Sequence, residues 1–257
     1  MNDNFKQLAV IAFAITLSLA MLVQCSTQAR ASGCGSEIKY PAVTGAMVGG
    51  RHFLDVVPAD YDASSEGRLI IQYHGFGMSK EWMRELAGGL EREADNRTIF
   101  FYPHASYQAW QQIENGIDIQ FFDQMVEYAK QKYCIGKVYV TGYSNGAFFV
   151  NWLITQRRAD ISAMAYVAGG SENTILVPSI GIHGRNDQTI PYSVGDRTRY
   201  NYASNNGCST AWLPPDLYGC IRPATCRVFD TVWCSWEGNH DWPKKFNEPI
   251  WQLFQHY

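Results

Sequence analysis

Short apolar runs alternate along most of the chain with longer stretches in which apolar residues recur about every third or fourth position. The short runs are rich in β-branched and aromatic residues, which is typical of buried strands. In the stretch that shows the longer spacing most clearly, Ile119, Phe122, Val126 and Ala129 fall on one face of a helix. The predicted strands span residues 51–57, 69–73, 98–102, 137–141, 163–167, 179–183 and 231–236. The predicted helices span or lie within residues 80–93, 118–133, 147–154, 188–205 and 249–256.

This alternation of strands and helices predicts an α/β fold, in which a mainly parallel central sheet carries helices on both faces. A chain of 257 residues is long enough for one such domain with a large core. In sheets of this kind the active residues gather in loops at the carboxyl ends of the strands. Residues in those loops are therefore the first candidates for chemistry.

The N-terminal segment has the three parts of a secretory signal peptide. Residues 8–23 are almost continuously apolar, Lys6 precedes them, and residues 29–31 have the sequence Ala-Arg-Ala. A basic start, an apolar run and an A-x-A cleavage site are typical of such signals. We expect residues 1–31 to be removed and residues 32–257 to form a single extracellular catalytic domain.

Two other interpretations of this segment remain open. Its apolar run of 16 residues, interrupted only by Thr16 and Ser18, approaches the lower limit for a membrane span, so the segment could stay attached as an anchor. A lipoprotein signal through Cys25 is less favoured, because Gln24 stands where a small residue is expected. The cleavage site favours removal, after which we expect no stable membrane association.

Cysteine usage indicates an oxidising compartment. The predicted mature domain holds an even number of cysteines, which in an exported protein indicates disulfide bonds, although the sequence does not choose the pairing. A zinc site is the alternative, and the lack of a C-x-x-C spacing disfavours it. Asn96 begins an Asn-Arg-Thr sequon, usable only in a eukaryotic secretory pathway. The cysteines are Cys34, Cys134, Cys208, Cys220, Cys226 and Cys234.

The charge of the chain argues against one class of partner. Its formal net charge is −3, and no run of five or more basic residues occurs. Proteins that bind nucleic acid usually carry a basic patch or stripe. We therefore expect no nucleic-acid partner.

Residues 142–146 form a G-x-S-x-G pentapeptide between a predicted strand and a predicted helix. Strand, sharp turn and helix are the context of a nucleophile elbow, in which the serine hydroxyl is exposed and the glycines avoid a clash between strand and helix. Ser144 is therefore the candidate nucleophile. The alternative is a buried structural turn.

A serine hydroxyl needs a base, and the base needs an orienting carboxylate. Asp187 follows one predicted strand in a tight turn, and His240 follows the last predicted strand, so both come after Ser144 in the order Ser, Asp, His. Asp196 is the fallback acid, although it lies farther from a strand end. His256 also follows in the chain, but it lies at the C-terminus.

Two backbone N–H groups are the candidate donors to an oxyanion. The first is that of Asn145, directly after the candidate nucleophile. The second comes from the H-G-F-G turn of residues 74–77, where Phe76 is the first choice and Gly75 the second. An ordinary glycine-rich turn is the alternative for this segment.

Together these motifs resemble a secreted esterase family that includes feruloyl esterases and polyhydroxybutyrate-depolymerase-like enzymes. The resemblance covers nearly the whole predicted mature chain. It implies an α/β-hydrolase fold, a Ser144–His240–Asp187 triad, and neither a cofactor nor a metal. The matching segments are residues 32–35 (SGCG), 139–146 (YVTGYSNG), 181–184 (GIHG) with Asp187, 190–192 (IPY), 205–208 (NNGC), 218–220 (YGC) and 238–243 (GNHDWP).

The chain also departs from the family pattern. Ala147 and Phe148 stand where the family often has glycine or tryptophan-glycine, Asn239 replaces a common glycine, and Cys226 and Cys234 look additional. We expect these differences to affect the pocket wall and the disulfide pairing more than the triad. They leave the substrate open.

Several aromatic residues follow loops that could line the site, but aromatic side chains most often serve packing. The sequence therefore assigns none of them a binding role, with Trp110 slightly favoured because the family often carries a tryptophan there. The others are Trp82, Tyr107 and Trp242.

The leading hypothesis is a secreted serine esterase that releases ferulic or related hydroxycinnamic acids from plant cell-wall polysaccharide. The alternative within the family is a polyhydroxyalkanoate depolymerase-like esterase. A secreted serine peptidase and an inactive binding module on the same fold are further alternatives, because a fold does not determine a function.

Overall fold

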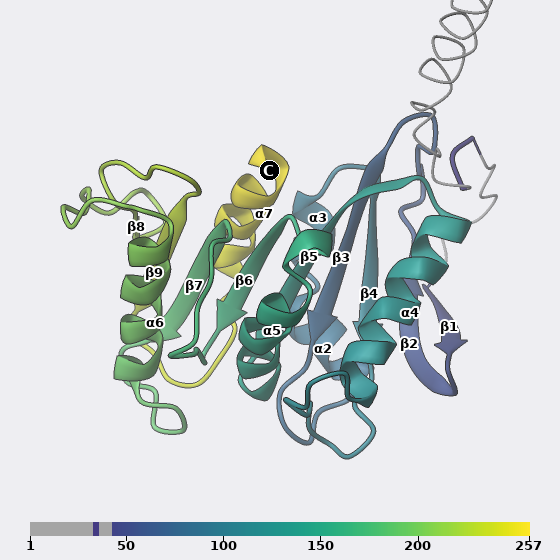
Figure 1. Cartoon of the computed structure of the whole chain (residues 1–257), viewed down its shortest axis with the longest axis horizontal. Helices are drawn as coiled ribbons and strands as arrows, with labels where there is room; N and C mark the ends of the chain where they lie inside the picture. The colour runs from purple at the N-terminus through teal and green to yellow at the C-terminus, as the bar shows by residue number, and fades with distance from the viewer. Residues whose placement is uncertain (1–32, 36–42) are drawn as a thin grey trace, which may run out of the picture.

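The computed structural model describes residues 33–35 and 43–257, which form one central sheet between two layers of helices (Figure 1). Within this part of the chain the sheet has nine strands in the order β1-β2-β4-β3-β5-β6-β7-β9-β8. The pairs from β4 to β9 along this order are parallel, whereas β1, β2 and β8 join antiparallel at the two edges. The expected mainly parallel α/β sheet is therefore confirmed.

The strands and helices have the following bounds. The strands are β1 (Val43–Val48), β2 (Arg51–Val56), β3 (Gly67–Tyr73), β4 (Thr98–Pro103), β5 (Ile135–Tyr143), β6 (Ala163–Val167), β7 (Ser179–Gly184), β8 (Cys220–Ile221) and β9 (Thr231–Trp236). The helices are α2 (Lys80–Ala87), α3 (Leu90–Glu93), α4 (Ile117–Lys132), α5 (Asn145–Gln156), α6 (Tyr192–Asn205) and α7 (Asn247–His256), with short 3-10 turns at Arg158–Asp160 and Lys244–Phe246.

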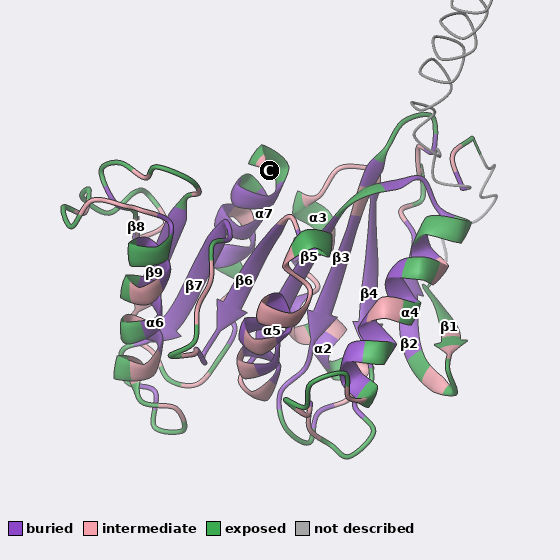
Figure 2. Cartoon of the chain, in the orientation of Figure 1, coloured by how far each residue is buried: buried purple, intermediate pink, exposed green. Residues whose placement is uncertain are grey.

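The helices divide between the two faces of the sheet. Figure 1 shows α4, α5 and α6 in front of the sheet and α2, α3 and α7 behind it. Most of the strands are buried between these layers, whereas the edge strand β1 is largely exposed (Figure 2). Each face has its own apolar cluster: Phe122 of α4 and Phe149 of α5 belong to one, and Met83 of α2 and Phe254 of α7 to the other. The parallel strands all point to the lower edge of the sheet in Figure 1, so their following loops meet there.

The sequence did not predict two of the strands, β1 and β8, or the break between helices α2 and α3. The edge strand β1 is mostly exposed and β8 has only two residues, so neither leaves a clear apolar run. The helical stretch predicted over residues 80–93 is two helices, because Gly88 and Gly89 separate α2 from α3. Glycine weakens a helix interior relative to alanine by about 1 kcal/mol, which favours a break at this pair.

Disulfide bonds join all six cysteines of the described residues. They link Cys34 to Cys134, Cys208 to Cys226 and Cys220 to Cys234. The two cysteines that look additional to the family pattern, Cys226 and Cys234, are thus the partners of Cys208 and Cys220. The predicted disulfide bonds are therefore present in the structure.

The predicted signal peptide, residues 1–31, lies outside the described residues, as does Cys25. Among the helices that the structure does describe, none has the length and apolar character needed to cross a membrane.

Candidate active site

Ser144 occupies the sharp turn between β5 and α5. Its φ is 54° and its ψ is −117°, a conformation that non-glycine residues rarely adopt and that is found mostly at functional sites. A Cβ on Gly142 would lie 2.1 Å from the carbonyl oxygen of Gly146, and a Cβ on Gly146 would lie 2.2 Å from that of Tyr73. Both positions therefore require glycine, as expected for a nucleophile elbow.

Asp187 lies in the loop after β7, where two backbone groups fix its carboxylate. Its Oδ1 accepts hydrogen bonds from the N–H groups of Thr189 and Ile190, each at 2.9 Å. Its side chain is buried, which opposes ionisation, but hydrogen bonds from His240, Ile190 and Thr189 outweigh burial and lower the pKa of the carboxyl. Asp187 is therefore held as a carboxylate, with Oδ2 directed at His240.

His240 lies in the loop after β9 and joins the acid to the serine. Its Nδ1 lies 2.8 Å from Oδ2 of Asp187, and its Nε2 lies 2.9 Å from Oγ of Ser144. Because the carboxylate can only accept, Nδ1 carries the proton, and the unprotonated Nε2 of the neutral ring accepts from the serine hydroxyl. The three predicted residues thus form one hydrogen-bonded chain.

Asn239 and Tyr143 hold the histidine loop in place, and the sequence did not identify either role. Oδ1 of Asn239 accepts from the backbone N–H groups of His240, at 2.8 Å, and Gln188, at 2.9 Å, so it ties the histidine loop to the acid loop. The hydroxyl of Tyr143 donates to the carbonyl oxygen of His240 at 3.0 Å. The departure from the family's glycine at position 239 therefore has a structural role in this chain.

Asn145 is the first residue of α5, so its N–H lies directly after the candidate nucleophile. The turn that contains Phe76 packs against the same serine. A Cβ on Gly75 would lie 3.3 Å from Cβ of Ser144. Among the hydrogen bonds of the described residues, none uses the N–H of Phe76 or of Asn145. Both predicted donors are therefore free for a ligand.

A buried histidine fixes the peptide between Gly75 and Phe76. Nδ1 of His74 lies 2.7 Å from the carbonyl oxygen of Gly75, and Nε2 accepts from the N–H of Ala105 at 3.1 Å. The N–H of Met78 also donates to the Gly75 oxygen, at 3.2 Å. Because C=O and N–H point in opposite directions across a trans peptide, these donors direct the Phe76 N–H away from themselves. Burial lowers the pKa of His74 to about 4, which keeps the ring neutral near pH 7.

Trp110 connects the His74 turn to Asn145 from within the core and does not line an open pocket. Its indole N–H donates to the carbonyl oxygen of His74 at 2.9 Å, and its backbone N–H donates to Oδ1 of Asn145 at 2.8 Å. Only 3% of Trp110 is exposed. Trp110, the aromatic residue that the family resemblance slightly favoured, therefore packs beneath the surface and leaves almost no area for contact with a ligand. Trp242 is buried as well.

The fallback residues do not enter the hydrogen-bonded chain. Oδ1 of Asp196 accepts from Arg199 on α6 at 2.7 Å, and His256 lies at the end of α7. His183 of β7 lies with its Nε2 3.2 Å from Oδ2 of Asp187. Among the described residues, no group of three or more His, Cys, Asp or Glu side chains is placed to hold a metal ion.

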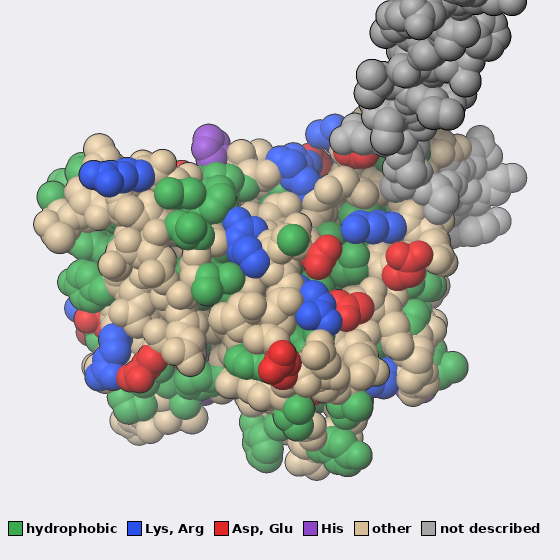
Figure 3. Space-filling view, in the orientation of Figure 1, with side chains coloured by type: hydrophobic (Ala, Val, Ile, Leu, Met, Phe, Trp, Pro, Cys, Tyr) green, Lys and Arg blue, Asp and Glu red, His purple; other side chains and the backbone are tan. Residues whose placement is uncertain are grey.

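The surface around the site is apolar at the lower edge of the sheet. Phe76, Tyr107 and Ile113 are exposed in the loops after β3 and β4. Figure 3 shows hydrophobic side chains gathered on the lobes that project at this edge.

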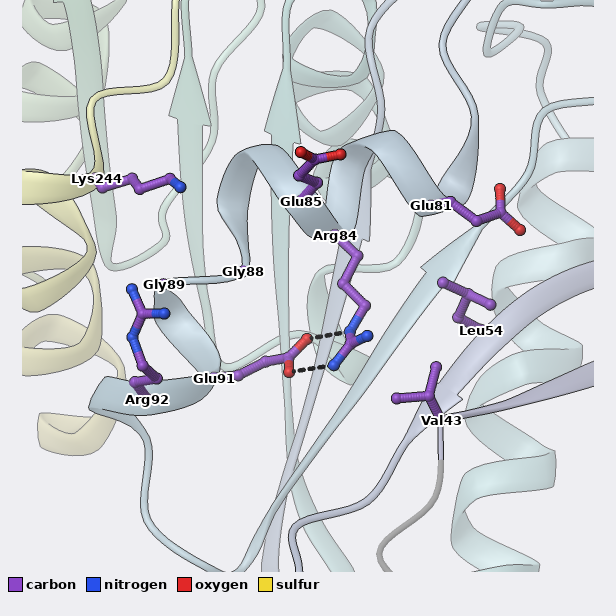
Figure 4. Close-up of a pocket in the computed structure, with 10 residues that line it drawn as sticks. All are labelled: Val43, Leu54, Glu81, Arg84, Glu85, Gly88, Gly89, Glu91, Arg92 and Lys244. Carbon is purple, nitrogen blue, oxygen red and sulfur yellow. Dashed lines mark hydrogen bonds and ion pairs between the residues drawn. The ribbon is translucent and has the colours of Figure 1, made fainter.

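A cavity of about 520 Å³ lies in another part of the molecule, beside α2 and α3. There Arg84 and Glu91 form a bidentate ion pair (Figure 4). None of Ser144, Asp187 and His240 lines it, so we assign it no part in the chemistry of Ser144.

Known proteins that are similar to this chain in sequence are esterases. No family model matches the chain. A probable feruloyl esterase C of Aspergillus niger is 27% identical over 240 residues, covering 83% of this chain and 84% of the relative. The feruloyl esterase C of Emericella nidulans is also 27% identical, over 83% of this chain and 84% of its own length. A feruloyl esterase D of Neurospora crassa is 24% identical over 77% of this chain.

Solved structures show the same fold. An acetyl xylan esterase from Aspergillus awamori superposes with a TM-score of 0.66 at 15% identity, covering 82% of this chain and 98% of that one. Est1E from Butyrivibrio proteoclasticus with ferulic acid bound has a TM-score of 0.56 at 12% identity, covering 83% and 98%. These comparisons give no support to the polyhydroxyalkanoate alternative. The resemblance expected from the motifs is confirmed: the chain has the fold of the α/β-hydrolase esterases and is similar over most of its length to curated feruloyl esterases.

Proposed function

We propose that this protein is a secreted serine carboxylic-ester hydrolase that releases ferulic or related hydroxycinnamic acids from plant cell-wall polysaccharide. The observation that carries the proposal is the chain of hydrogen bonds from Ser144 Oγ through His240 to Asp187, at 2.9 and 2.8 Å. The similarity to feruloyl esterases supports a hydroxycinnamoyl group as the acyl part of the substrate. The predicted signal peptide and the disulfides support export.

The first half of the reaction forms an acyl-enzyme. His240 Nε2 takes the proton of Ser144 Oγ as the oxygen attacks the ester carbonyl, and Asp187 holds the ring and stabilises the imidazolium. The backbone N–H groups of Phe76 and Asn145 donate to the oxyanion of the tetrahedral intermediate. The intermediate collapses when His240 gives its proton to the leaving alcohol oxygen.

The second half releases the acid. His240 removes a proton from a water molecule, which attacks the acyl carbon and forms a second tetrahedral intermediate in the same oxyanion site. Collapse of this intermediate returns the proton to Ser144 Oγ and frees the carboxylic acid. These proton transfers use only the side chains of the triad and require no cofactor.

Hydrolysis of methyl ferulate by the wild type and by Ser144→Ala tests the proposal. We expect ferulate release by the wild type and a loss of at least about 10³-fold in kcat for the variant, since the nucleophile is removed. A short 3-hydroxybutyrate oligomer serves as the comparison substrate. Hydrolysis of the oligomer alone would contradict the hydroxycinnamoyl assignment, and ferulate release that persists in Ser144→Ala would contradict the catalytic role of the serine.

A further inference from the structure

A cavity of about 250 Å³ opens next to the elbow, on the α5 and α6 side of the sheet. The N–H of Phe148 in its wall donates to the carbonyl oxygen of Ser144 at 3.1 Å, one helical turn away. A Cβ on Gly169 would lie 3.1 Å from that same oxygen and 3.5 Å from Cδ2 of Phe148. The next residue, Gly170, also lines the cavity. Phe148, which lines the cavity, and Gly169, which precedes a lining residue, thus both lie against the backbone of the candidate nucleophile. The cavity therefore adjoins the elbow.

The cavity and His240 lie on opposite sides of Ser144. His240 approaches over Tyr143, with ring centroids 5.1 Å apart, and the following Trp242 packs in the core shared with α2 and α7. The cavity is instead walled by α5, α6 and the loops after β4 and β6. In ester hydrolysis the histidine gives its proton to the leaving alcohol oxygen, so the alcohol must lie on the side of His240. The acyl group of a bound ester then extends away from His240, toward the cavity.

The lining of the cavity suits a small planar group with a polar end. Phe148 and Val194 supply apolar wall, and Gln112, Arg197 and Glu172 lie at the rim. Nη1 of Arg197 pairs with Oε1 of Glu172 at 2.5 Å, and both side chains are mostly exposed, so they remain available to a phenolic hydroxyl or methoxy group. The volume is slightly below the ~300 Å³ at which pockets for drug-sized ligands begin, and it is far larger than an acetyl group needs.

The wall formed by the loop after β6 is fixed before any ligand binds. Oγ1 of Thr198, which is 1% exposed, accepts from the N–H of Ser171 at 2.9 Å and lies 2.8 Å from the carbonyl oxygen of Val194. A Cβ on Gly170 would lie 2.2 Å from that Oγ1, so the loop is packed directly on α6. A wall held in this way loses little conformational entropy when an acyl group binds.

We propose that this cavity is the acyl subsite and that it binds the aromatic ring of a hydroxycinnamoyl group against Phe148 and Val194. The proposal rests on the proposed function, because it takes Ser144 as the nucleophile and an ester as the substrate. It adds the residues that select an aromatic acyl group over acetate, which are Phe148, Val194 and the rim pair of Arg197 and Glu172.

The test compares two esters with one leaving group, 4-nitrophenyl ferulate and 4-nitrophenyl acetate. Val194→Phe fills the cavity and Phe148→Ala removes its flat wall. We expect each variant to lower kcat/KM for the ferulate ester about tenfold or more, with kcat/KM for the acetate ester kept within about twofold. Val228→Phe is the matched control, since Val228 is 51% exposed in a distant loop. Binding of free ferulate to Ser144→Ala, with and without Val194→Phe, gives a second readout that does not depend on turnover.

Each outcome decides a different part of the proposal. A parallel fall on both esters, or no fall on either, would overturn the subsite while the esterase function stands. Equal ferulate affinity in the two Ser144→Ala proteins would overturn it as well. Hydrolysis of the acetate ester alone by the wild type would overturn the aromatic ligand class only. A wild type that cleaves neither ester, and no other carboxylic ester, would contradict the proposed function and the subsite with it.

Discussion

Nε2 of His183 lies 3.2 Å from Oδ2 of Asp187, the same carboxylate oxygen that faces His240. That nitrogen also lies 2.9 Å from the carbonyl oxygen of Ile190. Because a carbonyl oxygen only accepts, Nε2 carries a proton and His183 acts as a donor. Burial lowers the pKa of His183, so the ring stays neutral. The carboxylate is thus positioned by a neutral donor that does not cancel the charge facing His240.

Replacement of His183 should therefore lower kcat more than it changes KM. We expect His183→Ala to lose about tenfold in kcat, since a hydrogen bond to a charged group contributes about 1.5–3 kcal/mol. His183→Gln should recover part of that loss, because its amide can donate. Steady-state kinetics on methyl ferulate measure both, with the exposed His52→Ala as the matched control. Normal kcat in His183→Ala with a lower melting temperature would assign His183 to stability alone.

Local patterns were enough to predict which residues meet at the elbow. Ser144, Asp187 and His240 each follow a strand, and parallel strands end at one edge of the sheet, so chain order and turn chemistry bring them together. The seven predicted strands all occur, and most of the residues in each of them are buried. These features depend on short stretches of sequence.

Features that depend on contacts between distant segments could not be predicted. The buried position of Trp110 follows from its bonds to His74 and Asn145, which are 36 and 35 residues away in the chain. The bridging role of Asn239 needs Gln188, 51 residues away, and the disulfide pairing needs the final fold. The sequence marked Asn239 only as a departure from the family's glycine next to the candidate histidine, which says nothing about its partners.

Asp187→Asn should abolish most of the activity without unfolding the protein. An asparagine at this position can present its amide to Nδ1 of His240, which favours the wrong tautomer and leaves the imidazolium without a counter-charge. We expect kcat to fall by about 10⁴-fold. Asp196→Asn is the matched control, because Asp196 pairs with Arg199 outside the hydrogen-bonded chain, and its kcat should stay within about twofold. Equal losses in the two variants would contradict the assignment of the acid.

Reduction of the disulfides should lower the melting temperature by several degrees. A disulfide that closes a loop of about 15 residues contributes about 3 kcal/mol in the loop-entropy account, and one that closes about 100 residues contributes about 4.7. The bond from Cys34 to Cys134 spans 100 residues, whereas that from Cys220 to Cys234 spans 14. The double Cys→Ser variant of the first pair should therefore melt at a lower temperature than that of the second. The reverse order, measured by calorimetry at one pH, would show that native contacts around each bond outweigh loop entropy.

His74 makes the stability of the fold depend on pH in a direction that can be worked out. Its pKa is about 4 in the fold and 6.5 as an unperturbed side chain, because burial disfavours the charged ring. Between these values the unfolded chain binds a proton that the folded chain does not, so the free energy of unfolding falls as the pH drops from 6.5 to 4. The full effect is about 3 kcal/mol, at 1.36 kcal/mol per pH unit. Below pH 4 this contribution stays constant.

His74→Gln removes the titrating ring and isolates this effect from the other buried groups. Between pH 7 and pH 5 the wild type should lose about 2 kcal/mol through His74, or about 4–8 °C in melting temperature for a domain of this size. The drop in melting temperature between those two pH values should be smaller by that amount in His74→Gln, and unchanged in the exposed control His256→Gln. An equal drop in all three proteins would mean that His74 takes up a proton in the fold as easily as in the unfolded chain. The bonds from its ring to Gly75 and Ala105 would then not persist in solution, and the Phe76 N–H would lose the support that directs it toward the oxyanion.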